Sequence, residues 1–337
     1  LTAIDIHPPL YYLLLKLWVL LLGVGPEVAR FFSALIGTLL IPVVAVIGKR
    51  LDSWRTGSFA ALILAVMPLA VYYGQEVRMY GLVTLLAALS TYFFIRWQDG
   101  RRFQLGYVLS ASAALYTMYY AAFVVLAQFI SGQISPRRSR RRLLIPFVVV
   151  GLLYLPWIMY AGFQLVAYIS NKRDIEGYAT LTLPNFLADH LVAFSVGHLP
   201  IGLSPVMWSV IPAVALATVG LVVAAARRST RLLIFYLFVP LLAGYAVNLA
   251  VPFTPPFFER TLLLAAPAYW LLIALGLAWC WRKQSVLGGV TVVLVLVPAV
   301  ISLLVFYVTP RYSDEDYRPL LRQVAARATP AETQLAR

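Results

Sequence analysis

Long apolar stretches separated by short polar segments dominate the chain. A helix needs about 20 apolar residues to cross roughly 30 Å of hydrocarbon, and shorter helices can lie inside a bundle. Ten stretches meet or approach this length, at residues 30–48, 58–73, 80–95, 103–117, 119–132, 143–160, 204–226, 231–250, 261–281 and 286–308. The pattern therefore predicts an all-α fold, a polytopic transmembrane helix bundle of about ten spans.

Two shorter apolar segments are expected to lie outside this set of spans. Residues 8–22 are too few for an ordinary span, and Pro8 and Pro9 suit the first turn of a helix. We predict a re-entrant or interfacial helix there. A long loop is expected from Ala161 to Ser204, within which residues 184–197 have the pattern of a helix that lies on the membrane.

The composition agrees with a membrane protein and excludes other classes. Of 337 residues, 62% are hydrophobic and 12% are charged, whereas soluble domains are about one quarter charged. A water-soluble enzyme and a disordered chain are both excluded. The single cysteine, Cys280, excludes a disulfide within the chain and a metal site built from cysteines.

The basic residues predict which ends of the helices share a side of the membrane. Five loops, separated each time by two predicted spans, hold 16 of the 27 lysines and arginines, and their only acidic residues are Asp52 and Asp99. An excess of Lys and Arg marks the cytoplasmic side. We therefore expect a multi-pass plasma (inner) membrane protein, and the net charge of +14 requires no nucleic acid. The basic loop residues are Lys49, Arg50, Arg55, Arg96, Arg101, Arg102, Arg137, Arg138, Arg140, Arg141, Arg142, Arg227, Arg228, Arg231, Arg282 and Lys283.

Polar residues that suit chemistry gather at the opposite, periplasmic or extracellular face. His7 precedes two prolines at the start of the interfacial helix, where the helix dipole favours anions. Glu76 and Arg78 lie in a short loop between two spans, and Arg260 follows a segment with three prolines. A guanidinium group suits phosphate. Each cluster also has a structural interpretation, as a helix cap, a solvated turn or a charged pair at the membrane boundary.

Aromatic residues and histidines add weaker signals. Tyr116, Tyr119 and Tyr120 suit an aromatic belt at the membrane surface, or a contact to a sugar or an isoprenoid. His190 and His198 are eight residues apart, a spacing that matches no local metal motif. The sequence therefore identifies no cofactor, and a divalent metal is neither indicated nor excluded.

Several of these motifs together resemble the type-C glycosyltransferases of the protein O-mannosyltransferase and aminoarabinose-transferase superfamily. The similarity is greatest to its bacterial dolichyl-phosphate-mannose mannosyltransferase-like members. The motifs that carry it are His7-Pro8-Pro9-Leu10-Tyr11-Tyr12, residues 27–30, Gln75-Glu76-Val77-Arg78-Met79-Tyr80, Arg260 seven residues before Pro267, and Asp314-Glu315-Asp316-Tyr317-Arg318. Two departures are Met118, where many relatives have His, and Thr261, where an aromatic residue usually follows the Arg.

The resemblance implies that the chain is truncated at both ends. The family begins with a transmembrane helix and an outer loop whose acidic pair includes the expected catalytic base, and both would precede Leu1. Residues 1–308 are then the transmembrane domain without that helix and loop, and residues 309–337 begin a periplasmic or extracellular segment. A fragment without its catalytic base can be inactive.

The resemblance also implies the reaction, which is transfer of a sugar from a polyprenyl-phosphate-linked donor to an acceptor on the outer face. Inversion at the sugar carbon is expected, and the acceptor can be protein, glycan or lipid. Glu76 is expected to orient Arg78 or to contact the acceptor, and Asp5 is a substitute candidate for the missing base. The residues expected to bind phosphate or substrate are His7, Arg78, Arg260, Tyr80, Tyr119 and Tyr120.

Two other functions fit a bundle of this kind. A transporter or flippase for a lipid-linked sugar or small solute would explain the many spans and prolines, but such proteins usually place ionisable groups near the midplane. Here the charges gather at the helix ends instead. A structural membrane subunit would need no pocket at the outer face.

Overall fold

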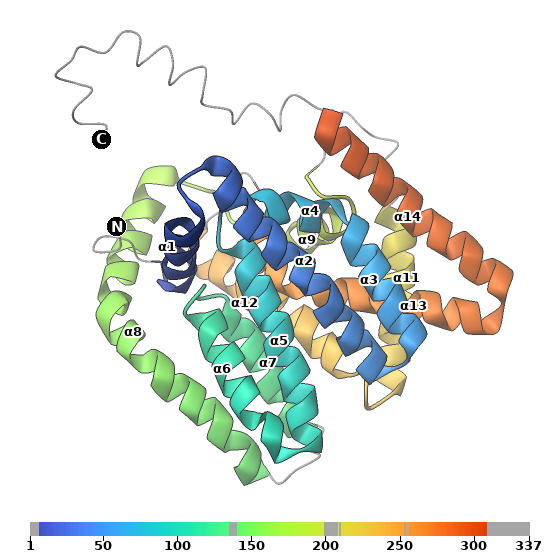
Figure 1. Ribbon diagram of the computed structural model, residues 1–337, viewed down its shortest axis with the longest axis horizontal. Helices are drawn as coiled ribbons and strands as arrows, with labels where there is room; N and C mark the ends of the chain where they lie inside the picture. Colours follow the sequence, from blue (N-terminus) through green and yellow to red (C-terminus); the bar gives the residue numbers. More distant parts are fainter. Residues whose placement is uncertain are drawn as a thin grey trace.

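The computed structural model describes residues 7–134, 140–198, 208, 210–252, 254–255 and 257–308, with the backbone alone at 140–142, 170 and 172–176. All regular elements within these ranges are helices (Figure 1). This confirms the predicted all-α class. Asp5 and the predicted C-terminal segment 309–337 lie outside the described residues.

The helices follow one another through short connections. Their bounds are α1 Leu10–Leu22, α2 Pro26–Leu51, α3 Trp54–Val66, α4 Pro68–Gln75, α5 Tyr80–Asp99, η1 Arg101–Phe103, α6 Gln104–Leu115, α7 Ala121–Ile134, α8 Arg140–Glu176, α9 Leu183–Val196, α11 Val210–Ala226, α12 Leu232–Ala250, η2 Phe258–Ala265, α13 Ala266–Lys283 and α14 Ser285–Val308.

Where they are described, the ten predicted spans fall on these helices, with 210–226 of the span predicted at 204–226 forming α11, but the helices differ in length. Among the described residues, six are long and apolar enough to cross a membrane, or seven if α3 and α4, which meet at 58°, form one broken span. The six are α2, α5, residues 143–169 of α8, α12, η2 with α13, and α14. The apolar helices α7 and α11 have 14 and 17 residues, and α6 has 12.

Helix α8 is longer than the pattern predicts. The expected loop from Ala161 is helical as far as Glu176, because the apolar sequence continues through Ile169 after the interruption at Pro156. Prolines are tolerated within membrane helices where neighbouring groups satisfy the freed backbone. The helix predicted at 184–197 is present as α9, with Thr182 accepting a hydrogen bond from the Asn185 N–H at its start.

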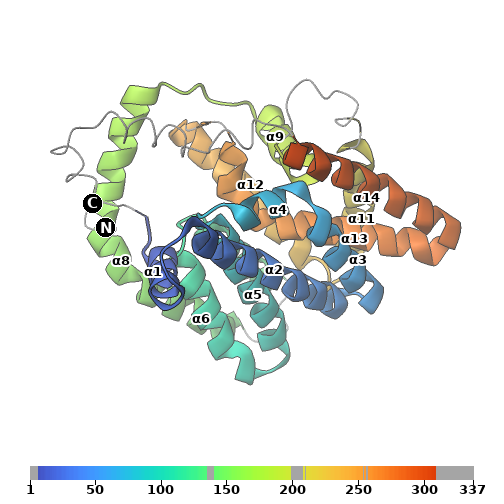
Figure 2. The ribbon, with the colours of Figure 1, turned by 45° about the horizontal axis from the view of Figure 1, so that its top comes forward.

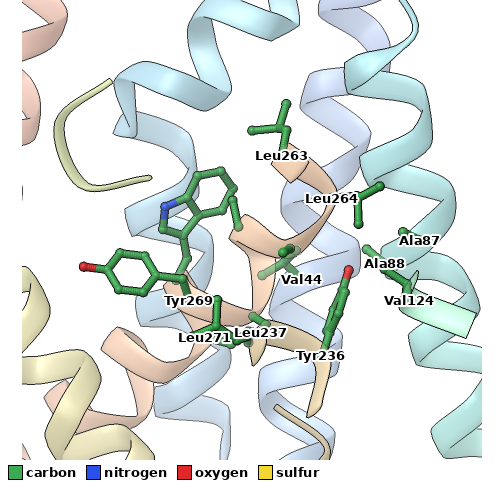
Figure 3. Packing of buried hydrophobic residues seen from close by; sticks show 14 of the residues in the cluster. Val44, Ala87, Ala88, Val124, Tyr236, Leu237, Leu263, Leu264, Tyr269 and Leu271 are labelled. Atoms are coloured by element: carbon green, nitrogen blue, oxygen red, sulfur yellow. The ribbon is translucent and has the colours of Figure 1, made fainter. Parts of the chain in front are cut away.

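The core is formed around α13 and the second half of η2, Leu262–Ala265, which the other helices bury almost wholly. Figure 3 shows Leu263 and Leu264 of η2 among side chains of α2, α5, α7 and α12, which are Val44, Ala87, Ala88, Val124, Tyr236 and Leu237. This packing places the first residues of η2 at a fixed position relative to α5.

Helices α11 and α13 cross at two glycines. A Cβ atom on Gly276 would collide with the Leu216 carbonyl oxygen, and one on Gly220 would collide with the Leu272 carbonyl oxygen. In a lipid environment, helix association relies on close packing, and small residues allow the backbones to approach. The crossing therefore requires glycine at both positions.

We predict that Gly276→Ala lowers the free energy of unfolding by about 1–3 kcal/mol, because the backbones must separate to admit the methyl group. Thermal unfolding in detergent, followed by circular dichroism, measures the effect. Gly289→Ala in α14 is the matched control, since no heavy atom lies within 4 Å of the added Cβ. Equal midpoints for the two variants would contradict the close crossing.

Charged residues from four of the predicted basic loops meet at one end of the bundle. Asp52, after α2, accepts hydrogen bonds from Arg227 and Arg282, and Arg50 donates to Asp99 at the end of α5. We call these five residues the basic end. Burial raises the pKa of the Asp52 carboxyl, but hydrogen bonds from Thr56 and Arg282 lower it, and the net pKa lies below its usual range.

We predict that Asp52→Asn destabilises the protein by about 1–3 kcal/mol at neutral pH, because it leaves two guanidinium groups without a carboxylate. Asp99→Asn is the control and should cost less than about 1 kcal/mol, because the Arg50–Asp99 pair is partly exposed. Since folding lowers the Asp52 pKa, its contribution is present above the carboxyl's ordinary pKa and is lost as the pH falls through the folded value. Unfolding midpoints of wild type and Asp52→Asn should therefore converge on acidification, and a constant difference would contradict the assignment.

Candidate functional site

A cavity of about 290 Å³ lies among segments that are far apart in the sequence. It is formed by the residues that precede α1, the loop before α5 with the first residue of α5, the turn between α6 and α7, the later part of α8, and the segment from α12 to η2. Its walls are His7, Pro8, Arg78, Met79, Tyr80, Met118, Tyr119, Tyr120, Leu165, Tyr168, Ile169, Val247, Val251, Pro252, Pro255, Arg260 and Thr261.

Six of the eight residues predicted as site residues line this cavity. They are His7, Arg78, Arg260, Tyr80, Tyr119 and Tyr120. Glu76 is in the loop before α5 but does not line the cavity, and Asp5 lies outside the described residues. The structure thus brings residues that are far apart in the sequence, such as His7 and Arg260, into one cavity.

Arg78 is positioned by a tight turn between α4 and α5. The Arg78 N–H donates to the Glu76 carbonyl at 2.8 Å, which closes a three-residue turn. Helix α5 begins two residues later at Tyr80. Arg78 therefore lies beside a helix N-terminus, where backbone N–H groups and the helix dipole both favour an anion.

Arg260 is positioned by a break between α12 and α13. Phe257 has φ 62°, which lies in the left-handed region that residues other than glycine rarely adopt. The Arg260 N–H donates to the Phe257 carbonyl at 3.2 Å, and the η2 turns carry the chain into α13. The Phe257 ring packs against the His198 ring, with centroids 4.3 Å apart, and this contact supports the strained conformation.

The two guanidinium groups share one aromatic ring. The Cζ atom of Arg78 lies 5.8 Å from the centroid of the Tyr80 ring, and that of Arg260 lies 5.7 Å from it. A cation over an aromatic face within about 6 Å is attracted by the ring quadrupole. Tyr80 is only 5% exposed, so its ring is a fixed platform for both arginines.

Hydrogen bonds connect the turn between α6 and α7, which forms another part of the cavity wall, to α8. The Tyr116 hydroxyl donates to the Leu153 carbonyl at 2.9 Å, and Trp157 Nε1 donates to the Tyr119 hydroxyl at 3.3 Å. The Leu10 N–H donates to the Tyr116 carbonyl at 3.0 Å, which ties the start of α1 to the same turn. Figure 2 shows α8 at one edge of the bundle, and α8 provides the apolar wall residues Leu165, Tyr168 and Ile169.

The charge of the cavity is positive and its walls are otherwise largely apolar. Of the described residues that line it, Arg78 and Arg260 are cationic and none is acidic. Helix α5 runs from Tyr80 at the cavity to Asp99 at the basic end, and α13 runs from the η2 segment to Arg282. The cavity and the basic end therefore lie at opposite ends of the same helices, as the charge pattern predicts.

Within the described part of the chain, no three His, Cys, Asp or Glu side chains are grouped so that they could hold a metal ion. The arrangement is suited instead to an anionic group attached to an apolar chain, because arginines and a helix N-terminus meet apolar walls in one cavity.

Sequence reasoning missed the contribution of α8. Leu165, Tyr168 and Ile169 fall in the segment expected to be a loop, although residues 163–169 are apolar apart from Gln164, which is a signal for a longer helix. Val247, another wall residue, falls within an ordinary predicted span, and only tertiary packing brings it to the cavity.

Comparison with protein families matches residues 6–160 to the family described as dolichyl-phosphate-mannose-protein mannosyltransferase. The matched range includes His7, Arg78, Tyr80, Tyr119 and Tyr120, whereas Tyr168 and Arg260 lie beyond it. A search of curated proteins gives no match.

Several solved structures have a similar fold. ArnT from Cupriavidus metallidurans in the apo state is 16% identical, with a TM-score of 0.57 and coverage of 83% of this chain and 51% of that one. ArnT bound to undecaprenyl phosphate is 18% identical, with a TM-score of 0.55 and coverage of 83% and 52%. The archaeal oligosaccharyltransferase AglB from Archaeoglobus fulgidus, in complex with an inhibitory peptide and a dolichol-phosphate, is 12% identical, with a TM-score of 0.60 and coverage of 89% and 47%.

These matches confirm the predicted resemblance to type-C glycosyltransferases and the multi-pass membrane fold. The chain spans about half the length of the solved structures that it resembles.

Proposed function

We propose that this chain is the membrane domain of a glycosyltransferase that uses a polyprenyl-phosphate-linked sugar donor. The observation that carries the proposal is the pair of arginines, Arg78 and Arg260, on one tyrosine ring in a cavity with apolar walls. The bound undecaprenyl phosphate of ArnT and the dolichol-phosphate of AglB, two proteins with this fold, support it.

The donor phosphate is held between Arg78 and Arg260. Both groups can donate two parallel hydrogen bonds to phosphate oxygens, and the N-terminus of α5 adds oriented backbone dipoles. His7 lies on the same cavity wall and adds a further hydrogen-bonding group. The polyprenyl chain extends along the apolar wall formed by Leu165, Ile169, Val247 and Val251, between α8 and α12.

The reaction is a displacement at the anomeric carbon of the sugar. An acceptor oxygen or nitrogen forms a bond to that carbon, the bond from the carbon to the phosphate oxygen breaks, and polyprenyl phosphate leaves with the bonding electron pair. Arg78 and Arg260 stabilise the charge that develops on the departing phosphate. Attack from the side opposite the phosphate would invert the configuration.

The acceptor's proton passes to a general base. No acidic side chain lines the described part of the cavity, so we assign the base to the segment before His7 or upstream of Leu1, with Asp5 as the candidate within this chain. Glu76, in the turn that carries Arg78, orients that arginine or contacts the acceptor. The acceptor can be a protein, a glycan or a lipid.

We place the protein in the plasma (inner) membrane, with the basic end in the cytoplasm and the cavity open to the periplasmic or extracellular side. The excess of arginine at the basic end supports this orientation. A flippase for a lipid-linked sugar is the second candidate, because the same cavity would hold the same headgroup. Turnover of the donor, which a flippase does not perform, distinguishes the two.

We predict that Arg78→Gln and Arg260→Gln, made in the full-length protein, each weaken binding of undecaprenyl phosphate about 10- to 100-fold, because each removes charge-assisted hydrogen bonds to phosphate. They should slow sugar transfer at least as much, since the phosphate becomes more charged as it leaves. Binding is measured in detergent micelles, and transfer is measured with a labelled polyprenyl-phosphate-linked sugar.

Arg102→Gln is the matched control, because this arginine also contacts an aromatic ring, that of Phe103, but lies next to the basic end. It should leave binding and transfer unchanged. Equal losses in all three variants, or none in Arg78→Gln and Arg260→Gln, would contradict the proposed phosphate site.

A further inference from the structure

A small recess adjoins the main cavity on the α12 side. Its volume is about 20 Å³, and it shares the wall residues Tyr120, Val247, Val251 and Thr261 with the cavity. Its other wall residues are Phe186, Gly244, Asn248, Phe258 and Leu262. A site of this size accommodates one water molecule or one substituent of similar volume, but no ring.

Asn248 supplies a buried donor to this recess. The side chain is 5% exposed, and its Oδ1 accepts a hydrogen bond from the Leu181 N–H at 3.2 Å. That bond assigns the oxygen and leaves Nδ2 as the second polar atom. Among the described residues, Nδ2 has no hydrogen-bond acceptor. An unpaired buried donor is destabilising, so a group that accepts its hydrogen bond would be bound favourably.

Thr261 supplies an acceptor to the same recess. Its Oγ1 donates its single hydrogen to the Phe258 carbonyl at 2.9 Å. The hydroxyl oxygen retains its lone pairs and can accept one further bond. The recess therefore contains one donor that is free among the described residues, Asn248 Nδ2, and one oxygen that can accept, Thr261 Oγ1. A single hydroxyl group can bond to both, because it accepts through its oxygen and donates its hydrogen.

We propose that the recess binds one hydroxyl group of the donor sugar, with Asn248 Nδ2 donating to the hydroxyl oxygen and Thr261 Oγ1 accepting its hydrogen. This inference rests on the proposed glycosyl transfer and adds a specificity-determining subsite to it. Four shared wall residues put the recess within reach of a sugar whose phosphate lies between Arg78 and Arg260. Sugars without a hydroxyl in the matching position would leave Asn248 Nδ2 without an acceptor and would be rejected.

The test combines changes in the donor sugar with substitutions in the full-length protein and measures kcat/KM for each combination. The donor is the best-transferred of polyprenyl-phosphate-linked mannose, glucose, galactose and aminoarabinose, and each of its monodeoxy forms is compared with it. For wild type, we expect one deoxy donor to lose about 10- to 100-fold in kcat/KM. Thr261→Val, which keeps the shape and removes the hydroxyl, should lose about 10-fold with the parent donor but almost nothing further with that deoxy donor.

Asn248→Asp is the second variant, because it keeps the acceptor for the Leu181 N–H while replacing the Nδ2 donor, and it should show the same loss of discrimination. Thr218→Val on α11 removes a hydroxyl that also donates to a backbone carbonyl, away from the cavity, and should retain the wild-type pattern. Undecaprenyl phosphate, which has no sugar, should bind equally to wild type, Thr261→Val and Thr218→Val, whereas the added carboxylate of Asn248→Asp should weaken its binding.

Unchanged ratios of deoxy to parent donor in both recess variants would overturn the inference and show that the recess holds only water. Weaker binding of undecaprenyl phosphate by Thr261→Val would overturn it too, because the hydroxyl would then act at the phosphate. Wild-type protein that binds undecaprenyl phosphate but transfers no sugar from any donor would contradict the proposed function itself, and with it this subsite.

Discussion

The structure depends on holding two arginines, Arg78 and Arg260, in one largely apolar cavity that no acidic side chain among the described residues lines. An arginine at the centre of a membrane helix costs about 2.5–3.5 kcal/mol on insertion scales, and an anion in the same place is also unfavourable. This protein places Arg78 and Arg260 at breaks between helices, where the chain leaves the apolar span. The Tyr80 ring between them lowers the cost of their proximity, and an anionic headgroup would lower it further.

The remainder of the fold fixes the positions of these two helix breaks relative to each other. Helix α13 is enclosed by its neighbours and begins where η2 ends, so any displacement of α13 would move Arg260. The glycine crossing with α11 and the Asp52 contacts to Arg227 and Arg282 determine where the other end of α13 lies. Packing and ion pairs far from the cavity thus contribute to the distance between the two arginines. A helix is rigid, so contacts that fix one end of α13 also fix the end that leads from Arg260.

The sequence predicts the fold class and most of the cavity because both follow from local signals. Apolar stretches identify the helices, and prolines and charges identify the breaks where Arg78, Arg260 and His7 lie. The extent of α8 is different, because Gly162 and Gln164 interrupt the apolar pattern after the predicted span ends at Tyr160, and the helix continues past both. The left-handed Phe257 and the unpaired Nδ2 of Asn248 depend on tertiary contacts, and neither residue type signals its role at its own position. Asp5 and any base upstream stay a prediction.

An experimental structure of the full-length protein with undecaprenyl phosphate bound tests the central claim most directly. The account predicts phosphate density within hydrogen-bonding distance of both the Arg78 and the Arg260 guanidinium groups, with the polyprenyl chain along α8 and α12. Phosphate density at the basic end, beside Arg227 and Arg282, or a lipid that contacts neither Arg78 nor Arg260, would contradict it.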